Sequence, residues 1–130
     1  MTLRLCVGWL LLVVFLCGCT PGPVLHPVSG AVTLDGAPLP EGDITFTPAD
    51  PSLAPEQGKI KDGKYELKSR EGKMKVTISA SKIKPGGALG AAGEPVAEEY
   101  IPTKYNDAST LTADVKSSGE NKIDFPLDSK

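Results

Sequence analysis

After residue 27, apolar side chains recur at every second position in run after run, and this spacing constrains the fold more than any other feature. A period of two is that of a β-strand with one buried face. The 112 residues of 19–130 include 24 prolines and glycines, which is too many for long uninterrupted helices. The clearest alternating run sets Met74, Val76, Ile78 and Ala80 against Lys73, Lys75, Thr77 and Ser79. The pattern predicts an all-β domain.

Seven runs with this spacing are separated by turn residues. They lie at 28–34, 44–46, 57–61, 64–68, 73–80, 111–115 and 123–127. Asp62 and Gly63 connect the third run to the fourth, and a two-residue Asp-Gly connection predicts a tight β-hairpin. Short strands with polar outer faces favour two antiparallel sheets packed face to face, so we expect a seven-stranded β-sandwich.

The amino terminus carries a short apolar segment. Residues 5–16 are twelve apolar or small residues behind the single positive charge of Arg4. As a helix they span about 18 Å, whereas the hydrocarbon core of a bilayer is roughly 30 Å thick. The length and the flanking residues are typical of a cleaved signal peptide, which we place at residues 1–18.

The sequence Leu16-Cys17-Gly18-Cys19 closes this segment and resembles the lipobox of bacterial lipoproteins. The resemblance implies cleavage between Gly18 and Cys19 and transfer of a diacylglycerol group to the Cys19 thiol. Acylation of the new amino group, with fatty acids such as palmitate, usually follows in that family. A thiolate is a soft nucleophile suited to forming a stable thioether with the lipid donor. The alternatives are an ordinary signal peptide with two incidental cysteines, or an N-terminal anchor helix.

A lipoprotein of this kind is held at the cell envelope through the lipid on Cys19. The expected partner of Cys19 is therefore the membrane. Thr20 at the second mature position resembles the pattern of lipoproteins sorted to the outer membrane, so we favour the outer membrane or the periplasmic face. Residues 19–27 contain three prolines and a glycine and are expected to form an extended tether. Residues 28–130 then form one domain.

Charge and cysteine content exclude several protein classes. Residues 19–130 contain 13 basic and 16 acidic residues, a net charge of −3, which argues against a basic nucleic-acid binder. No second long apolar segment supports a polytopic membrane protein. Because no cysteine follows Cys19, the domain is not a disulfide-stabilised mini-protein.

The opening of the domain resembles the carboxypeptidase regulatory-like family. The resemblance rests on Val28, Gly30 and Val32 in the first strand, the Asp35-Gly36 turn, Pro38-Leu39, and the second strand after Gly42 with Ile44 and Phe46. It implies a prealbumin-like (transthyretin-like) Greek-key sandwich. Locally, Gly30 leaves room for a close backbone approach or a bulge, and Pro38-Leu39 stiffens the crossing and fills one end of the core. In larger enzymes of the family, such a module accompanies a catalytic domain without performing chemistry.

Few residues in the domain support catalysis. The one histidine, His26, lies in the expected tether, so nucleophilic catalysis through a histidine and multi-histidine zinc sites are not supported. Hydroxyisourate hydrolases and ring-cleaving dioxygenases share the sandwich class. Both depend on histidines that this domain lacks, so neither activity is supported. A carboxylate-based hydrolase using Glu98, Glu99 or Asp107 stays open, although adjacent residues of an extended chain point in opposite directions. No calcium-loop pattern occurs, and we expect no catalytic residue, metal or cofactor.

The longest stretch without strand periodicity is 84–103, and loops of this length are often functional. Within it, 97–101 is a candidate for a single helical turn. Tyr100, Lys104 and Tyr105 form a candidate interaction surface, because paired tyrosines beside a loop can stack on sugar rings or contact a protein. The alternative is that both rings cover one end of the domain. The lysines at 59, 61, 64, 68, 73, 75 and 82 are expected to form a solvated outer face.

These observations predict a lipid-anchored, non-catalytic β-sandwich module with a structural or binding role at the cell envelope. The candidate partners are an envelope protein, or a carbohydrate or cell-wall ligand bound through 84–105. We expect no nucleic acid as a partner. The competing hypothesis is the hydrolase that uses loop carboxylates.

Overall fold

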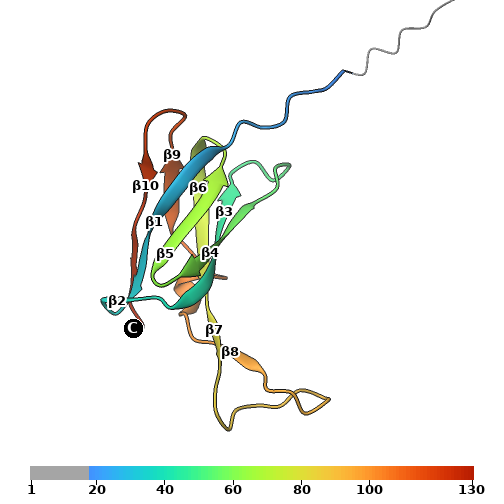
Figure 1. Cartoon of the computed structure of the whole chain (residues 1–130), viewed down its shortest axis with the longest axis vertical. Helices are drawn as coiled ribbons and strands as arrows, with labels where there is room; N and C mark the ends of the chain where they lie inside the picture. Colours follow the sequence, from blue (N-terminus) through green and yellow to red (C-terminus); the bar gives the residue numbers. More distant parts are fainter. Residues whose placement is uncertain (1–17) are drawn as a thin grey trace, which may run out of the picture.

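The computed structural model describes residues 18–130, and within them nearly all regular structure is β-strand (Figure 1). Nine strands form one curled sheet, and two more form a separate hairpin. The elements are β1 His26–Leu34, β2 Ala37–Pro38, β3 Glu41–Pro48, β4 Glu56–Lys61, β5 Lys64–Ser69, β6 Gly72–Ser79, β7 Ser81–Ile83, β8 Ala97–Glu99, the 3-10 turn η1 Thr103–Tyr105, β9 Thr112–Val115, β10 Asn121–Lys122 and β11 Phe125–Leu127.

The main sheet has the strand order β10-β1-β5-β4-β3-β6-β9, with β2 and β11 also paired to β1. Most neighbouring strands are antiparallel, but β10 and β11 run parallel to β1, with Val28 opposite Asn121 and Val32 opposite Phe125. The last strands therefore pair with the first. This long-range pairing fills one edge of β1, while β5 fills the other.

The predicted all-β class is confirmed, but the seven-stranded Greek-key sandwich is not. Each of the seven expected runs overlaps a strand, and three of them extend beyond it, at Ala80, at Leu111 and at residues 123–124. The structure adds β2, β7, β8 and β10, and the main strands form one curled, mainly antiparallel sheet. Strand β1 also begins at His26, two residues earlier than the domain boundary expected from the sequence.

The inner face of the curled sheet carries the residues that the alternation assigned to it. Three aromatic rings meet there: Phe46 lies 6.3 Å from Tyr65 and 6.4 Å from Phe125, and Tyr65 lies 6.0 Å from Phe125, measured between ring centroids. The buried apolar residues are Val28, Val32, Leu39, Ile44, Phe46, Ile60, Tyr65, Leu67, Met74, Val76, Ile78, Ala80, Ile101, Tyr105, Ala113, Val115, Phe125 and Leu127. Burial of this set is the main stabilising contribution to the fold.

Both Asp-Gly connections are tight turns, as expected. Asp62 and Gly63 have φ values of 52° and 73°, and they place Lys61 directly opposite Lys64 in the β4–β5 hairpin. Positive φ at both central positions is the geometry that favours an Asp-Gly pair. Asp35 and Gly36 make the equivalent turn between β1 and β2.

Gly30 is required by a close backbone approach, which confirms one of the two roles considered for it. A Cβ atom at this position would lie 1.8 Å from the carbonyl oxygen of Ile123 and 2.9 Å from the Tyr65 ring. The Tyr65 hydroxyl donates a hydrogen bond of 2.7 Å to the same Ile123 oxygen. Leu39 is buried at one end of the core, in agreement with the role expected for Pro38-Leu39.

Asn121 joins the two edges of the curled sheet. Its Oδ1 accepts a hydrogen bond from the Lys116 amide, and its Nδ2 donates to the carbonyl oxygens of Lys116 and Pro27. Lys116 follows edge strand β9, and Pro27 belongs to β1, beside edge strand β10. One buried side chain therefore connects segments from opposite ends of the chain.

The stretch 84–103, expected to lack strand periodicity, is framed by a projecting hairpin. Strands β7 and β8 pair from Ser81 with Glu99 to Ile83 with Ala97. The predicted helical turn at 97–101 is wrong, because 97–99 are held extended by this pairing. A short turn, η1, occurs instead after Pro102, whose fixed φ of −56° suits the start of a helix.

We refer to residues 81–99 as the arm. Figure 1 shows that the arm leaves the sheet at the end opposite to the one where residues 18–25 enter.

Candidate functional site

Cys19, the predicted lipidation residue, lies in an exposed segment ahead of the folded body. Residues 18–25 are all exposed and belong to no strand or helix. The Cys19 thiol is free. The predicted signal peptide lies outside the described residues except for Gly18, which is exposed. The predicted cleavage position between Gly18 and Cys19 is therefore sterically open on its described side.

The predicted tether is shorter than 19–27. His26 and Pro27 belong to β1, where they lie opposite Ser69 and Lys68 of β5. His26 is half-buried, which corrects the expectation that it is a solvated tether residue. The pairing of β1 with β5 extends to these residues, so the extended segment ends at Leu25.

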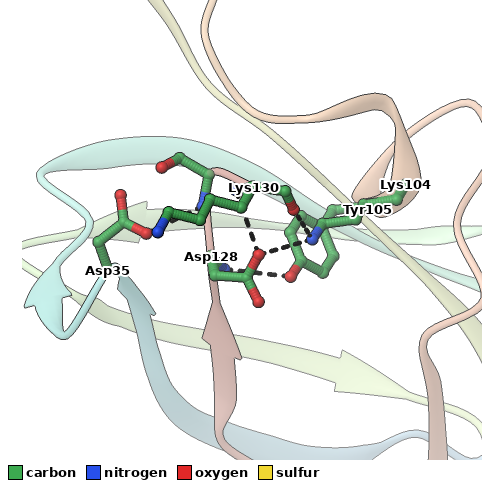
Figure 2. Close-up of polar contacts among 6 residues, drawn as sticks. Asp35, Lys104, Tyr105, Asp128 and Lys130 are labelled. Atoms are coloured by element: carbon green, nitrogen blue, oxygen red, sulfur yellow. Dashed lines mark hydrogen bonds and ion pairs between the residues drawn. The ribbon is translucent and has the colours of Figure 1, made fainter.

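Lys104 and Tyr105 of the predicted interaction surface lie together, at one end of the body (Figure 2). The Tyr105 side chain is only 9% exposed and belongs to the hydrophobic core. Its hydroxyl accepts a hydrogen bond of 3.1 Å from the Asp128 amide. The Lys104 ammonium lies 5.0 Å from the centroid of the Tyr105 ring and 2.6 Å from Asp128 Oδ1. The Tyr105 ring is therefore buried in the body. This agrees with the alternative that the ring covers one end of the domain.

Further hydrogen bonds near Lys104 hold the last residues of the chain against the body. The Ser129 amide donates a hydrogen bond of 2.9 Å to Asp35 Oδ1, and Lys104 also donates to the Lys130 carbonyl oxygen. The hydrogen bond with Asp128 raises the pKa of Lys104, and that bond lowers the pKa of Asp128. Hydrogen bonds from Ser129 lower the pKa of Asp35. Figure 2 shows this cluster, which joins the β1–β2 turn, η1 and the residues after β11.

Tyr100, the third predicted interaction residue, lies at the base of the arm, where its ring is half-buried. The Lys82 ammonium lies 4.9 Å from the ring centroid, within the range of a cation–π contact. Burial, followed by the charges of Glu99 and Glu41, raises the pKa of the Tyr100 hydroxyl. A surface hollow of about 310 Å³ borders this ring and is lined by Pro40, Glu41, Lys61, Asp62, Ser81, Lys82 and Tyr100.

The carboxylates considered for hydrolysis have separate contacts. Glu99 Oε1 accepts hydrogen bonds from the amides of Ala80 at 2.8 Å and Ile101 at 3.0 Å. Glu98, the residue before Glu99, lies directly opposite Lys82 in the β7–β8 pairing. Because consecutive residues of a strand point to opposite faces, Glu98 and Glu99 do not converge on one point. Glu99 is thereby a positioning residue for the arm, a role that the sequence did not indicate.

The lysines expected on the outer face are exposed. Lys59 pairs with Asp43 across β3 and β4 and lies opposite Glu66 of β5. Because positive and negative side chains alternate between neighbouring strands, this face is mixed in charge.

Within residues 18–130, no three histidine, cysteine or acidic side chains are grouped as a metal site would require. Over the same residues, no helix has the length and apolar character needed to cross a bilayer.

Comparisons with known proteins give little further assignment. No protein-family model matches the chain, and no curated protein matches it in sequence. Among solved structures, the chain is similar to a 9R-lipoxygenase from Cyanothece PCC8801, with a TM-score of 0.43 and 11% sequence identity. The similarity covers 84% of this chain and 18% of the lipoxygenase, so this chain spans less than a fifth of that protein. A similarity of this degree assigns no activity.

Proposed function

We propose that the protein is a lipid-anchored, non-catalytic module of the cell envelope, attached through Cys19. The observation that carries the proposal is the position of this cysteine, which ends the lipobox-like sequence and begins an exposed segment that leads into β1. The segment keeps the thiol away from the folded body. A modifying enzyme can therefore reach Cys19 without unfolding any strand.

The length of the segment suits an anchor. Residues 19–25 include Pro21 and Pro23, and an extended proline-rich chain rises about 3.1 Å per residue, which gives a reach of roughly 20 Å. The headgroup layer on each side of a bilayer is roughly 5–8 Å thick. Each buried methylene of an acyl chain contributes about 0.8 kcal/mol, so two or three chains hold a protein of this size stably. The body then lies in the aqueous space beside the membrane, at the outer membrane or the periplasmic face.

Metabolic labelling with a fatty-acid probe tests the anchor. We expect the wild-type protein to be labelled and recovered with membranes, and the Cys19→Ser variant to be unlabelled and released. The Thr20→Ser variant is the matched control, because it alters the neighbouring residue and keeps the thiol. Equal labelling of the wild type and Cys19→Ser would exclude lipidation at this position.

For the body, we propose a divergent carboxypeptidase regulatory-like module of the prealbumin type. The support comes from the sequence resemblance over 28–46 and from the local geometry there: Gly30 makes a close backbone approach, Asp35-Gly36 forms a turn and Leu39 is buried. Modules of that family accompany chemistry without performing it. We therefore expect a broad hydrolase screen to show no turnover. Turnover that is lost in Glu98→Gln or in Glu99→Gln would contradict the proposal.

A second candidate function is glycan binding at the hollow beside Tyr100. An aromatic ring next to carboxylates and lysines offers both a stacking surface and hydrogen-bonding groups for a sugar. On a glycan array, Tyr100→Ala should remove any signal, whereas Lys73→Ala, on β6 outside the hollow, should not. The Tyr105→Ala variant is unsuitable for this test because the Tyr105 ring belongs to the core.

A further inference from the structure

Both strand edges of the arm are unpaired, whereas the two edge strands of the main sheet, β9 and β10, are connected through Asn121. Strands β7 and β8 form a two-stranded sheet of their own, so within residues 18–130 the outer edge of each strand has no neighbouring strand. Unpaired edges present a row of backbone donors and acceptors that can pair with another chain. Addition of a strand at such an edge is a common mode of protein recognition.

Exposed apolar side chains are concentrated on the same arm. Among the described residues, six large apolar side chains are exposed, and three of them belong to the arm: Ile83 is 62% exposed, Leu89 66% and Val96 40%. Grouped exposed apolar residues often mark an interaction surface. The arm therefore offers apolar contacts in addition to its backbone groups.

The two strands of the arm carry side chains of opposite charge. Lys82 and Lys84 lie in and directly after β7, whereas Glu98 lies in β8 and Glu94 precedes it. Pairing of β7 with β7 of a second copy would bring lysines together, and pairing of β8 with β8 would bring glutamates together. Pairing of β7 with β8 of a second copy sets lysines against glutamates. Like charges across an interface are costly, so the charges select the third arrangement.

The arm is also held in a defined position at its base. The Glu99 carboxylate bridges the amides of Ala80 and Ile101, and the Tyr100 amide donates to the Ala80 carbonyl oxygen at 3.1 Å. These bonds connect the arm to the end of β6 and to the buried residue Ile101. A fixed base lowers the entropic cost of docking through the arm.

From these observations we propose that the arm is a docking element for a second copy of this chain, with β7 of one copy paired to β8 of the next. Such a contact uses two different surfaces, so it is heterologous and can continue from copy to copy. This inference goes beyond the anchoring function and does not depend on acylation of Cys19.

Thiol crosslinking of the full chain in cells tests the pairing. Two differently tagged chains are co-expressed, one with Ser81→Cys in β7 and the other with Ala97→Cys in β8. A short bismaleimide should link the two chains to each other, and each variant expressed alone should link at least fivefold less. The parent chain without an added cysteine is the control for linkage through Cys19, and all cell fractions are analysed so that a failed membrane anchor is seen separately.

A charge exchange provides the decisive comparison. The double change Lys82→Glu with Glu98→Lys preserves the cross-strand pair within each arm. Two chains that both carry it should crosslink as well as two parent chains, whereas a mixed pair should crosslink at least fivefold less, because each β7–β8 contact then joins like charges. Equal crosslinking of mixed and matched pairs, dominant linkage between identical cysteine positions, or no linkage at all would overturn the proposal.

Discussion

The curled body and the arm are built by different means from one continuous chain. In the body, residues far apart in sequence meet in a buried core. Tyr65 of β5 donates a hydrogen bond to Ile123, and Asn121 of β10 donates one to Pro27 of β1. In the arm, every residue from 81 to 99 is exposed except the half-buried Gly87 and Gly90. Its order depends on a three-residue strand pairing and on the Glu99 carboxylate. Stability is therefore concentrated in the body, while the arm can change with little effect on the core.

The largest expected effect comes from breaking the close approach at Gly30. In Gly30→Ala, the added methyl group would meet the Ile123 carbonyl oxygen, so the segment beside β1 must move away. We expect the free energy of unfolding to fall by about 3 kcal/mol, measured by urea denaturation. Gly22→Ala is the control, since a Cβ there has nothing within 4 Å. A loss below about 1 kcal/mol would show that the approach is not tight.

The next effect concerns the link between the two edges of the sheet. Asn121→Ala removes the hydrogen bonds to Lys116 and Pro27 and leaves their polar groups without these partners. We expect a loss of about 2 kcal/mol in the free energy of unfolding. Lys122→Ala, one residue further along β10 and exposed, should change it by less than about 0.5 kcal/mol. Equal effects of the two changes would contradict a closing role for Asn121.

A smaller effect, dependent on pH, is expected at Tyr65. Tyr65→Phe removes the hydrogen bond to the Ile123 oxygen, with an expected loss of about 1 kcal/mol at neutral pH. Burial, followed by the charge of Asp124, raises the pKa of the Tyr65 hydroxyl in the folded protein. The unfolded chain therefore ionises first, and the contribution of the neutral hydroxyl is lost as the pH rises above about 10. Urea denaturation between about pH 9 and 11 should show a steeper decline for the wild type than for Tyr65→Phe, and parallel declines would contradict this assignment.

The smallest expected effect on the body comes from releasing the arm. Glu99→Ala removes both hydrogen bonds at the base of the arm, whereas Glu98→Ala leaves them in place. Limited proteolysis should cut within 84–96 several times faster in Glu99→Ala than in Glu98→Ala, because local opening of the arm governs cleavage there. The urea midpoint of the body should be nearly the same in both variants. A large fall of that midpoint in Glu99→Ala would show that the arm and the body unfold together.

The same division explains how much could be predicted from the sequence. In the body, the period of two assigned Met74, Val76 and Ile78 to the buried face, and the Asp62-Gly63 pair located a hairpin, because both signals are local. The parallel return of β10 and β11 beside β1 depends on contacts between residues more than 90 positions apart, for which local spacing carries no signal.

For the candidate site, the sequence identified individual residues but not their structural surroundings. Exposure of Cys19 follows from a proline-rich segment that cannot build a core. The burial of Tyr105 follows instead from η1 packing against the end of the core, which its neighbours in sequence do not reveal. Strand β8 was missed because Ala97 and the two following glutamates have no alternating pattern, and its pairing with β7 depends on the fold of the chain between them.

Mass spectrometry of the amino-terminal peptide, from protein purified from membranes, shows whether Cys19 is the lipid anchor. We expect a peptide that begins at Cys19 and carries the mass of a diacylglyceryl group on sulfur, with or without a further acyl group on the amino nitrogen. A peptide that begins at Cys19 or at another residue and carries no lipid would contradict this expectation.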